Sequence, residues 1–162
     1  MAYGGGICQV SSTLYNSAFF ANLEIVERHN HQFITSYVPA GRDSTVVYGS
    51  KDLKFKNNRT YPIKIECKVK NGIVTCSIYG IKEPNEYNVQ FDIETVSKFG
   101  PKIRYEKTQA IPQGTEQIKQ KGSNGIIVNV YKIIKQNGAL ISKTLLYQDT
   151  YNALEKIILT NS

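Results

Sequence analysis

The sequence contains no tryptophan, only one methionine and only two histidines among its 162 residues. It has no run of about 18 apolar residues, so no segment is expected to span a membrane as a helix. No secretory signal peptide is expected either, because Met1 leads directly into a glycine-rich loop. Zinc-site spacings such as Cys-x-x-Cys or His-Glu-x-x-His are also absent. These absences exclude a transmembrane helix and argue against a zinc-finger protein.

Acidic residues are fewer than basic ones: the chain has 13 Asp and Glu and 20 Lys and Arg, which gives a net charge of +7. Such a balance suggests an anionic partner. The lysines are dispersed through alternating strand patterns and no RNA-binding signature accompanies them, so nucleic acid is not expected. A polyanionic cell-wall polymer, or simply a solvated basic surface, explains the charge as well. The hydrophobic content of 41% and the eleven tyrosines describe a folded, strand-rich chain.

The stretch from Gly4 to Tyr15 is the most informative part of the chain. Three glycines lead straight into Cys8, and the residues that follow have helical spacing. Apolar residues recur there at steps of three and four: Val10, Leu14, Ala18 and Ala21. A thiol at a helix start lies near free N–H groups and the positive end of the helix dipole, which favours the thiolate of a nucleophilic cysteine. The alternative is a small buried core cysteine after a tight glycine loop.

Short strands are expected after this helix, which ends at Asn22. The candidates are Leu23–Arg28, Phe33–Val38, Ser44–Tyr48 and Leu53–Lys56. Pro39 ends the second of them, and Gly41-Arg42-Asp43 forms a turn before the third. The first part of the chain is therefore expected to place one main helix against an antiparallel sheet.

The clearest pattern is a β-hairpin around Asn71-Gly72, the dipeptide most typical of two-residue turns. Apolar and polar residues alternate before and after it, from Ile63 to Lys70 and from Ile73 to Tyr79. This register places Cys67 directly opposite Cys76 at a non-hydrogen-bonded pair, where side chains are closest. The two cysteines are expected either to form a disulfide or to remain as reduced thiols on a core face.

Residues 80–86 contain Pro84 and are expected to form a linker to a second part that has neither histidine nor cysteine. The candidate strands of that part are Tyr87–Val96, Ile103–Gln109, Ile126–Ile134, Ala139–Tyr147 and Lys156–Leu159. Asn137-Gly138 predicts another hairpin turn. We therefore expect an α+β module over residues 1–82 and an all-β module over residues 87–162. The second module is interpreted as a spacer or a wall-binding unit.

Cys8, His31 and Asp43 are the candidate catalytic residues. On a helix, a strand and the neighbouring strand, they would supply a thiol nucleophile, its general base and the carboxylate that fixes the imidazole tautomer. His29 is the alternative base, because both histidines would point to one face of a strand. A second chemistry uses Cys8, His29 and His31 as zinc ligands with an open position for water. The structural alternative is that the histidines cap a strand end and Asp43 serves a turn.

Four motifs in the first part resemble the VanW family, which takes its name from an accessory protein of vancomycin-resistance clusters. They are GGGICQVSSTLYN at residues 4–16, ERHNH at 27–31, GRD at 41–43 and YGSKDLKFKN at 48–57. The second part is similar to the wall-associated G-five domain. The segments that carry this weaker likeness are Gln113-Gly114-Thr115, Gln120-Lys121-Gly122, Asn124-Gly125 and Asn137-Gly138.

The resemblance implies an extracytoplasmic, Gram-positive cell-envelope protein whose first module is truncated at its N-terminus. The implied partner is peptidoglycan or another anionic wall polymer, and no cofactor is expected. Two functions are consistent with it: binding or modifying peptidoglycan through the Cys8–His31–Asp43 thiol site, or a non-catalytic wall-binding or structural role. The order of Cys helix, His strand and Asp strand also looks like a reduced transglutaminase or papain-type core.

Overall fold

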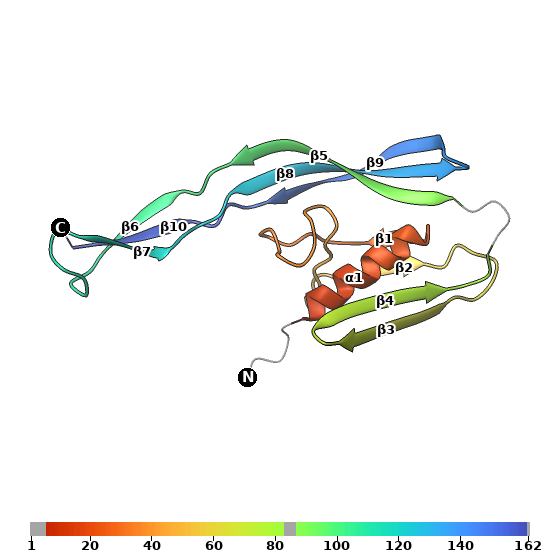
Figure 1. Cartoon of the computed structure of the whole chain (residues 1–162), viewed down its shortest axis with the longest axis horizontal. Helices are drawn as coiled ribbons and strands as arrows, with labels where there is room; N and C mark the ends of the chain where they lie inside the picture. Colours follow the sequence, from red (N-terminus) through yellow and green to blue (C-terminus); the bar gives the residue numbers. More distant parts are fainter. Residues whose placement is uncertain (1–5, 83–86, 162) are drawn as a thin grey trace.

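The computed structural model describes residues 6–82 and 87–161, in which one helix precedes ten strands. They are α1 (Ile7–Phe20), β1 (Glu24–Glu27), β2 (Lys54–Lys56), β3 (Lys64–Lys70), β4 (Ile73–Tyr79), β5 (Asn88–Phe99), β6 (Ile103–Lys107), β7 (Glu116–Gln120), β8 (Gly125–Gln136), β9 (Ala139–Tyr151) and β10 (Lys156–Thr160). The helix packs on an antiparallel hairpin and a mostly-β region follows, which confirms the expected fold class. Figure 1 shows that region as an elongated ribbon that passes α1 and the hairpin and continues to the C-terminus. Gly4, Gly5 and residues 83–86 of the expected linker lie outside the described residues.

Helix α1 begins after Gly6, whose φ of 108° suits glycine alone. It ends in a Schellman motif: Asn22 has a φ of 57° and donates its N–H to the Phe19 carbonyl, while the Leu23 N–H donates to the Ala18 carbonyl. The buried residues of the helix are Ser11, Ser12, Tyr15, Ala18 and Phe19. Two serines are among them because their hydroxyls bond the backbone of the loop before β2. Within the described residues, no helix is long and apolar enough to cross a membrane.

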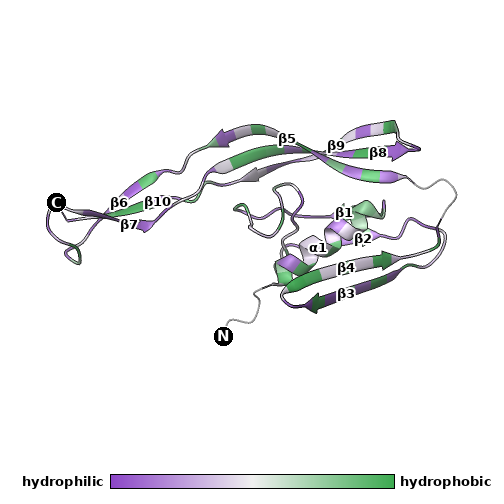
Figure 2. Cartoon of the chain, viewed as in Figure 1, coloured by the Kyte–Doolittle hydropathy of each residue, from purple (hydrophilic) through white to green (hydrophobic). Residues whose placement is uncertain are grey.

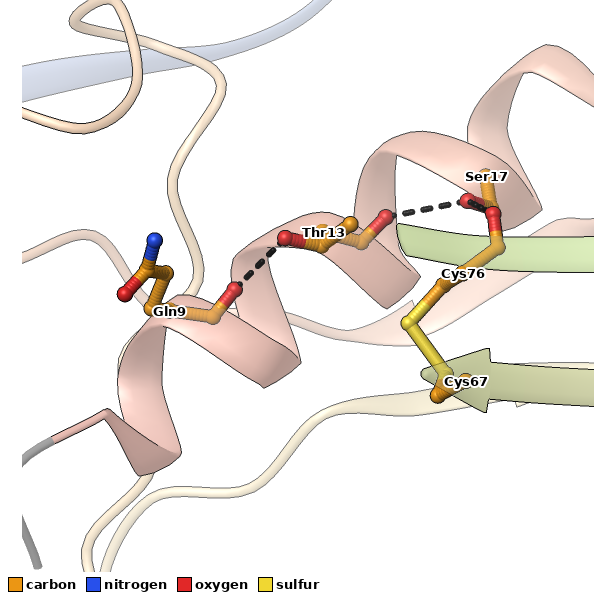
Figure 3. The surroundings of a disulfide bond; sticks show 5 residues. All are labelled: Gln9, Thr13, Ser17, Cys67 and Cys76. Atoms are coloured by element: carbon orange, nitrogen blue, oxygen red, sulfur yellow. Dashed lines mark hydrogen bonds between the residues drawn. A yellow bond between two sulfur atoms is a disulfide. The ribbon is translucent and has the colours of Figure 1, made fainter. Parts of the chain in front are cut away.

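The β3–β4 hairpin has the expected register, with Cys67 opposite Cys76. Asn71 and Gly72 have φ values of 51° and 75°, as a type I′ turn requires. Strand β4, visibly more hydrophobic than β3 in Figure 2, is the one that contacts the helix. The Cα atoms of Cys67 and Cys76 lie 4.1 Å apart and the two sulfurs form a disulfide, so this alternative is confirmed. Figure 3 shows the bond beside α1, where the Ser17 hydroxyl donates to the Cys76 carbonyl at 2.7 Å.

Removing this disulfide is expected to lower the free energy of unfolding by about 2–3 kcal/mol, because the open chain regains the entropy of a closed loop. The sequence separation of 9 residues makes that loop a short one. The test compares thermal unfolding of the wild type and a Cys67→Ala/Cys76→Ala variant, each with and without dithiothreitol. The reductant is expected to lower the melting temperature of the wild type and leave that of the variant unchanged. Equal melting temperatures for the two chains without reductant contradict the prediction.

The prediction of strands at Phe33–Val38 and Ser44–Tyr48 is wrong. Both segments are irregular in the structure, apart from one isolated bridge in the second. Backbone groups in or next to these segments bond to separate parts of the chain and not to one strand. The Thr45 N–H donates to the His29 carbonyl at 2.8 Å, and the Gln32 carbonyl accepts from the residue after β9 at 2.7 Å. A segment rich in strand-favouring side chains forms a strand only where it can pair with the edge of another strand. In the described residues neither of these segments pairs with a named strand.

The second part contains two three-stranded sheets. In one of them β8 pairs antiparallel with β5 and, through the expected Asn137-Gly138 turn, with β9. In the other, β10 runs parallel to β6 and antiparallel to β7, a mostly polar strand that the sequence pattern did not predict. Phe91 of β5 stacks on Phe19 of α1 with ring centroids 3.6 Å apart, so this part packs against the helix. The buried residues at the centre of its core are Val128, Val130 and Tyr151.

Candidate functional site

Asp43 is the centre of the candidate site, and its side chain is 1% exposed. Its Oδ2 accepts hydrogen bonds from the His31 backbone N–H at 2.7 Å and from His31 Nδ1 at 2.6 Å. Its Oδ1 accepts from Arg28 Nη2 at 2.9 Å and from the Tyr151 hydroxyl. Four donors thus surround one carboxylate, which uses its full capacity as an acceptor. The structure therefore brings His31 and Asp43 together, although neither residue lies on a strand.

Gly41 allows the loop that carries Asp43 to lie against the sheet. Its φ is 84°, and a Cβ at this position would lie 2.6 Å from Cγ2 of Val130. Its N–H donates to the Tyr151 hydroxyl at 2.7 Å, and its carbonyl accepts from the Tyr147 hydroxyl at 3.1 Å. The close approach that a glycine permits therefore places Asp43, two residues later, in buried surroundings.

The hydrogen bonds of His31 define its tautomer. Because the Asp43 carboxylate is an acceptor, Nδ1 of the neutral imidazole carries the proton and Nε2 presents a lone pair. That lone pair accepts from the Tyr37 hydroxyl at 3.1 Å, and the two rings meet edge to face. Asp43 thus holds the imidazole in the form that a general base needs.

Cys8 is the second residue of α1 and the free cysteine of the chain. Its Sγ lies 3.4 Å from Thr45 Oγ1 and 3.7 Å from the Val46 carbonyl oxygen. Within the described residues its sulfur makes no hydrogen bond to either imidazole. The loop that carries Asp43 therefore also contacts the thiol, but the direct Cys8–His31 contact expected from the sequence is not made in this structure.

Tyr37 connects the surroundings of Cys8 with His31. Burial raises the pKa of its phenol, the polar Ser12 side chain opposes this rise, and the nearby Cys8 adds to it. The same hydroxyl bonds Nε2 of His31. Sequence reasoning missed Tyr37 because it was counted as an ordinary residue of the expected strand. No spacing or motif marks a lone tyrosine as the neighbour of a thiol and an imidazole.

His29, the alternative base, belongs to a separate and more exposed cluster. Its Nε2 lies 3.1 Å from Glu27 Oε1, and Lys54 Nζ lies 2.6 Å from the other oxygen of that carboxylate. Hydrogen bonds from Lys54 and His29 lower the pKa of Glu27 to about 2. In the part of the chain that the structure describes, no three His, Cys, Asp or Glu side chains gather to hold a metal ion, and Cys8, His29 and His31 form no such group.

Arg28 connects Asp43 to strand β9. Its side chain is 4% exposed, and its Nη1 donates to both carboxylate oxygens of Asp149 at 2.7 and 2.6 Å. Its Nε donates to the Asp43 carbonyl oxygen at 2.6 Å, and its guanidinium lies 4.5 Å from the centroid of the Tyr147 ring. Burial raises the pKa of the Asp149 carboxyl, and Arg28 opposes that rise. Sequence reasoning missed this cluster because no local pattern relates partners 121 positions apart.

Two open clefts flank the start of α1. One, of about 620 Å³, is lined in part by Ile7 and by Val46, whose carbonyl contacts the thiol of Cys8. The other, of about 430 Å³, is lined in part by Tyr37 and Arg42. A ligand in the first cleft would lie beside the neighbours of the thiol, and a ligand in the second would reach the tyrosine that bonds His31.

Two parts of the chain match two different known families. Residues 1–79 match the family model of VanW like protein, and residues 92–160 match that of the G5 domain. The chain carries a VanW-like region followed by a G5 domain. Cys8, His31 and Asp43 lie in the VanW-like region, whereas Asp149 and Tyr151 lie in the G5 domain. This combination indicates a cell-wall-associated, extracytoplasmic protein.

Individual relatives match parts of the chain. It is 47% identical over 76 residues to the uncharacterized protein YoaR of Bacillus subtilis (strain 168). That alignment covers 47% of this chain and 25% of YoaR, so the match spans about a quarter of the relative's length. The solved IgA1 protease G5 domain is 20% identical, over 49% of this chain and 95% of that structure, with a TM-score of 0.32. The HP0197 G5 domain is 19% identical, over 46% and 97% respectively, with a TM-score of 0.27.

Proposed function

We propose that this protein acts on peptidoglycan in the Gram-positive cell envelope by thiol-dependent acyl transfer at an amide bond. In this proposal Cys8 is the nucleophile, His31 the general base, and Asp43 the carboxylate that orients the imidazole. The observation that supports it most is the pairing of the buried Asp43 carboxylate with the partly exposed His31 ring, with 2.6 Å between Oδ2 and Nδ1. The Asp43 carboxylate fixes the imidazole, and Nε2 faces the half-exposed hydroxyl of Tyr37. A general base has this arrangement, because the nitrogen that accepts the proton is free of its own proton.

The proposed first step moves one proton from the Cys8 thiol to Nε2 of His31. In this proposal the Tyr37 phenol, which bonds that nitrogen, passes its own proton to Nε2 and receives the thiol proton, so the thiol must turn from Thr45 and Val46 toward the Tyr37 hydroxyl. The thiolate attacks the amide carbon, and the carbon–nitrogen bond breaks as the leaving amine takes the proton back along the same route. Water then cleaves the thioester, which releases a carboxylic acid and restores the thiol. The N–H groups of the first turn of α1, which precede the Val10–Gly6 hydrogen bond, are available to stabilise the oxyanion.

A non-catalytic wall-binding role is the second candidate. Two observations favour it: the net charge of +7, which suits an anionic polymer, and the contacts of the Cys8 sulfur with Thr45 and Val46 instead of His31. In that case the thiol is a structural group at the start of α1, and both parts of the chain hold the wall.

Incubation of the full chain with purified peptidoglycan sacculi separates the two candidates. The wild type is expected to change the muropeptide profile seen by liquid chromatography and mass spectrometry, and Cys8→Ala is expected to abolish that change. Both chains are expected to sediment equally with the sacculi, because the substitution leaves the surface charge intact. The Cys67→Ala/Cys76→Ala chain is the matched control, since it removes cysteines outside the site and should keep the activity. An unchanged profile with the wild type, or full activity of Cys8→Ala, rejects the thiol mechanism, and sedimentation without activity supports the binding role.

A further inference from the structure

We propose that strand β9 of the G5 domain completes the thiol site of the VanW-like region, with Tyr151 and Asp149 as positioning residues for Asp43 and His31. This inference rests on the proposed function of the site. It makes the two family regions one functional unit, in which the second region is more than a spacer or a wall anchor.

The contacts of Tyr151 are the first argument. Its side chain is buried, with 1% of the residue exposed, and its hydroxyl donates to Oδ1 of Asp43 while it accepts the Gly41 N–H at 2.7 Å. A buried hydroxyl that is satisfied on both its donor and acceptor sides fixes what it bonds. In this case it fixes both the carboxylate of Asp43 and the backbone of the turn that precedes it.

Asp149 acts on the same carboxylate through Arg28. It holds the guanidinium by two hydrogen bonds, so that Nη2 and Nε of Arg28 can reach the side chain and the backbone carbonyl of Asp43. A guanidinium is a planar fork with fixed donor directions, so the carboxylate that anchors one side of it determines where the other side points.

Backbone contacts hold the histidine loop to the same segment. The Asn152 N–H, directly after β9, donates to the Gln32 carbonyl at 2.7 Å, and the Asn30 side chain donates to the Thr150 carbonyl at 2.9 Å. These bonds lie on either side of His31. Both the histidine loop and the Asp43 loop lack regular secondary structure, and β9 with the residue after it bonds to each of them.

The test uses the full chain with Tyr151→Phe, which removes one oxygen and keeps the ring. In ¹⁵N spectra of the imidazoles, wild-type His31 is expected to show the tautomer protonated at Nδ1, and Tyr151→Phe to show a mixture of tautomers. The His31→Gln chain identifies the signal, since the sequence has only two histidines. The turnover number on sacculi is expected to fall about tenfold with an unchanged Michaelis constant, because a hydrogen bond to a charged group is lost away from the substrate.

Two controls separate positioning from stability. Tyr105→Phe removes a hydroxyl from a tyrosine that is 57% exposed on β6, and should leave the spectrum and the turnover unchanged. Val89→Ala weakens the buried face of β5 without touching Asp43, and should lower the melting temperature but keep the tautomer.

The outcomes distinguish the two proposals. A Tyr151→Phe chain with the wild-type tautomer and turnover overturns the inference and leaves the thiol mechanism intact. If the wild type has no activity on sacculi, the thiol mechanism fails, and the ¹⁵N spectrum alone then decides whether β9 positions His31. A mixture of tautomers in Val89→Ala as well as in Tyr151→Phe also overturns the inference, because the effect then follows from loss of stability.

Discussion

Replacing Asp43 with asparagine is expected to lower the rate of the proposed peptidoglycan cleavage by about 10³–10⁴-fold. The wild-type carboxylate accepts from four donors, two from His31 and one each from Arg28 and Tyr151. An amide of the same shape must present its NH₂ group either to the two His31 donors or to the donors of Arg28 and Tyr151. If it faces His31, the imidazole has to accept at Nδ1 and carry its proton on Nε2, where it cannot act as a base. If it faces Arg28, the buried guanidinium loses a charged partner and the loop loosens.

The measurement is the rate of muropeptide release per folded chain, with circular dichroism used to verify folding. Asp92→Asn is the matched control, because Asp92 is a half-exposed carboxylate on β5, outside the candidate site, whose Oδ2 lies 2.6 Å from Lys143. It is expected to keep the wild-type rate. A folded Asp43→Asn chain that works as fast as the wild type removes His31 and Asp43 from the mechanism.

The Arg28→Met chain is expected to lose about 3–5 kcal/mol in the free energy of unfolding at neutral pH. Methionine fills a similar volume but leaves the carboxylates of Asp43 and Asp149 buried and without their shared cation. Arg104→Met is the matched control: Arg104 is 53% exposed and pairs with Glu106 and Glu155, so the expected loss is at most about 1 kcal/mol. Urea unfolding of the three chains, monitored by circular dichroism, gives both values.

The loss caused by Arg28→Met is expected to diminish as the pH falls from 7 toward 4. Burial already raises the pKa of the Asp149 carboxyl in the wild type, and Arg28 opposes that rise. Without Arg28 the folded-state pKa rises further above the unfolded value of about 4. A carboxyl with a raised folded pKa destabilises the fold above that pKa, and the penalty disappears below the unfolded pKa because both states are then protonated. A loss that stays constant or grows as the pH falls contradicts this account of the cluster.

Local chemistry made several parts of the fold predictable. Asn71-Gly72 predicted the β3–β4 hairpin and hence the pairing of Cys67 with Cys76, because that dipeptide adopts the two positive φ angles of a type I′ turn more easily than others. Asn137-Gly138 predicted the β8–β9 hairpin for the same reason. The helix beginning near Cys8 also followed from its spacing and from the glycines before it.

The loops of the site were predictable only in part. The residue types suggested that His31 and Asp43 are partners, and they are bonded in the structure. They were expected on neighbouring strands but lie in irregular segments. The sequence pattern shows which side chains favour a strand, but it does not show whether a partner strand is present. The separation of Cys8 from His31 and the position of Tyr37 depend on the path of these loops, which no periodicity describes.

The sequence by itself determined the α1 helix, the two Asn-Gly hairpins, the opposed cysteines and the residue types of the proposed thiol site, since each depends on contacts within about ten positions or on side-chain chemistry alone. Only the tertiary structure decided what surrounds Asp43. Arg28 and Tyr151 meet it from separate parts of the chain, and Asp149 pairs with Arg28 across 121 positions. The physical reason is burial: polar groups removed from water must bond whichever partners the packed core brings to them, and that choice is made by the whole fold.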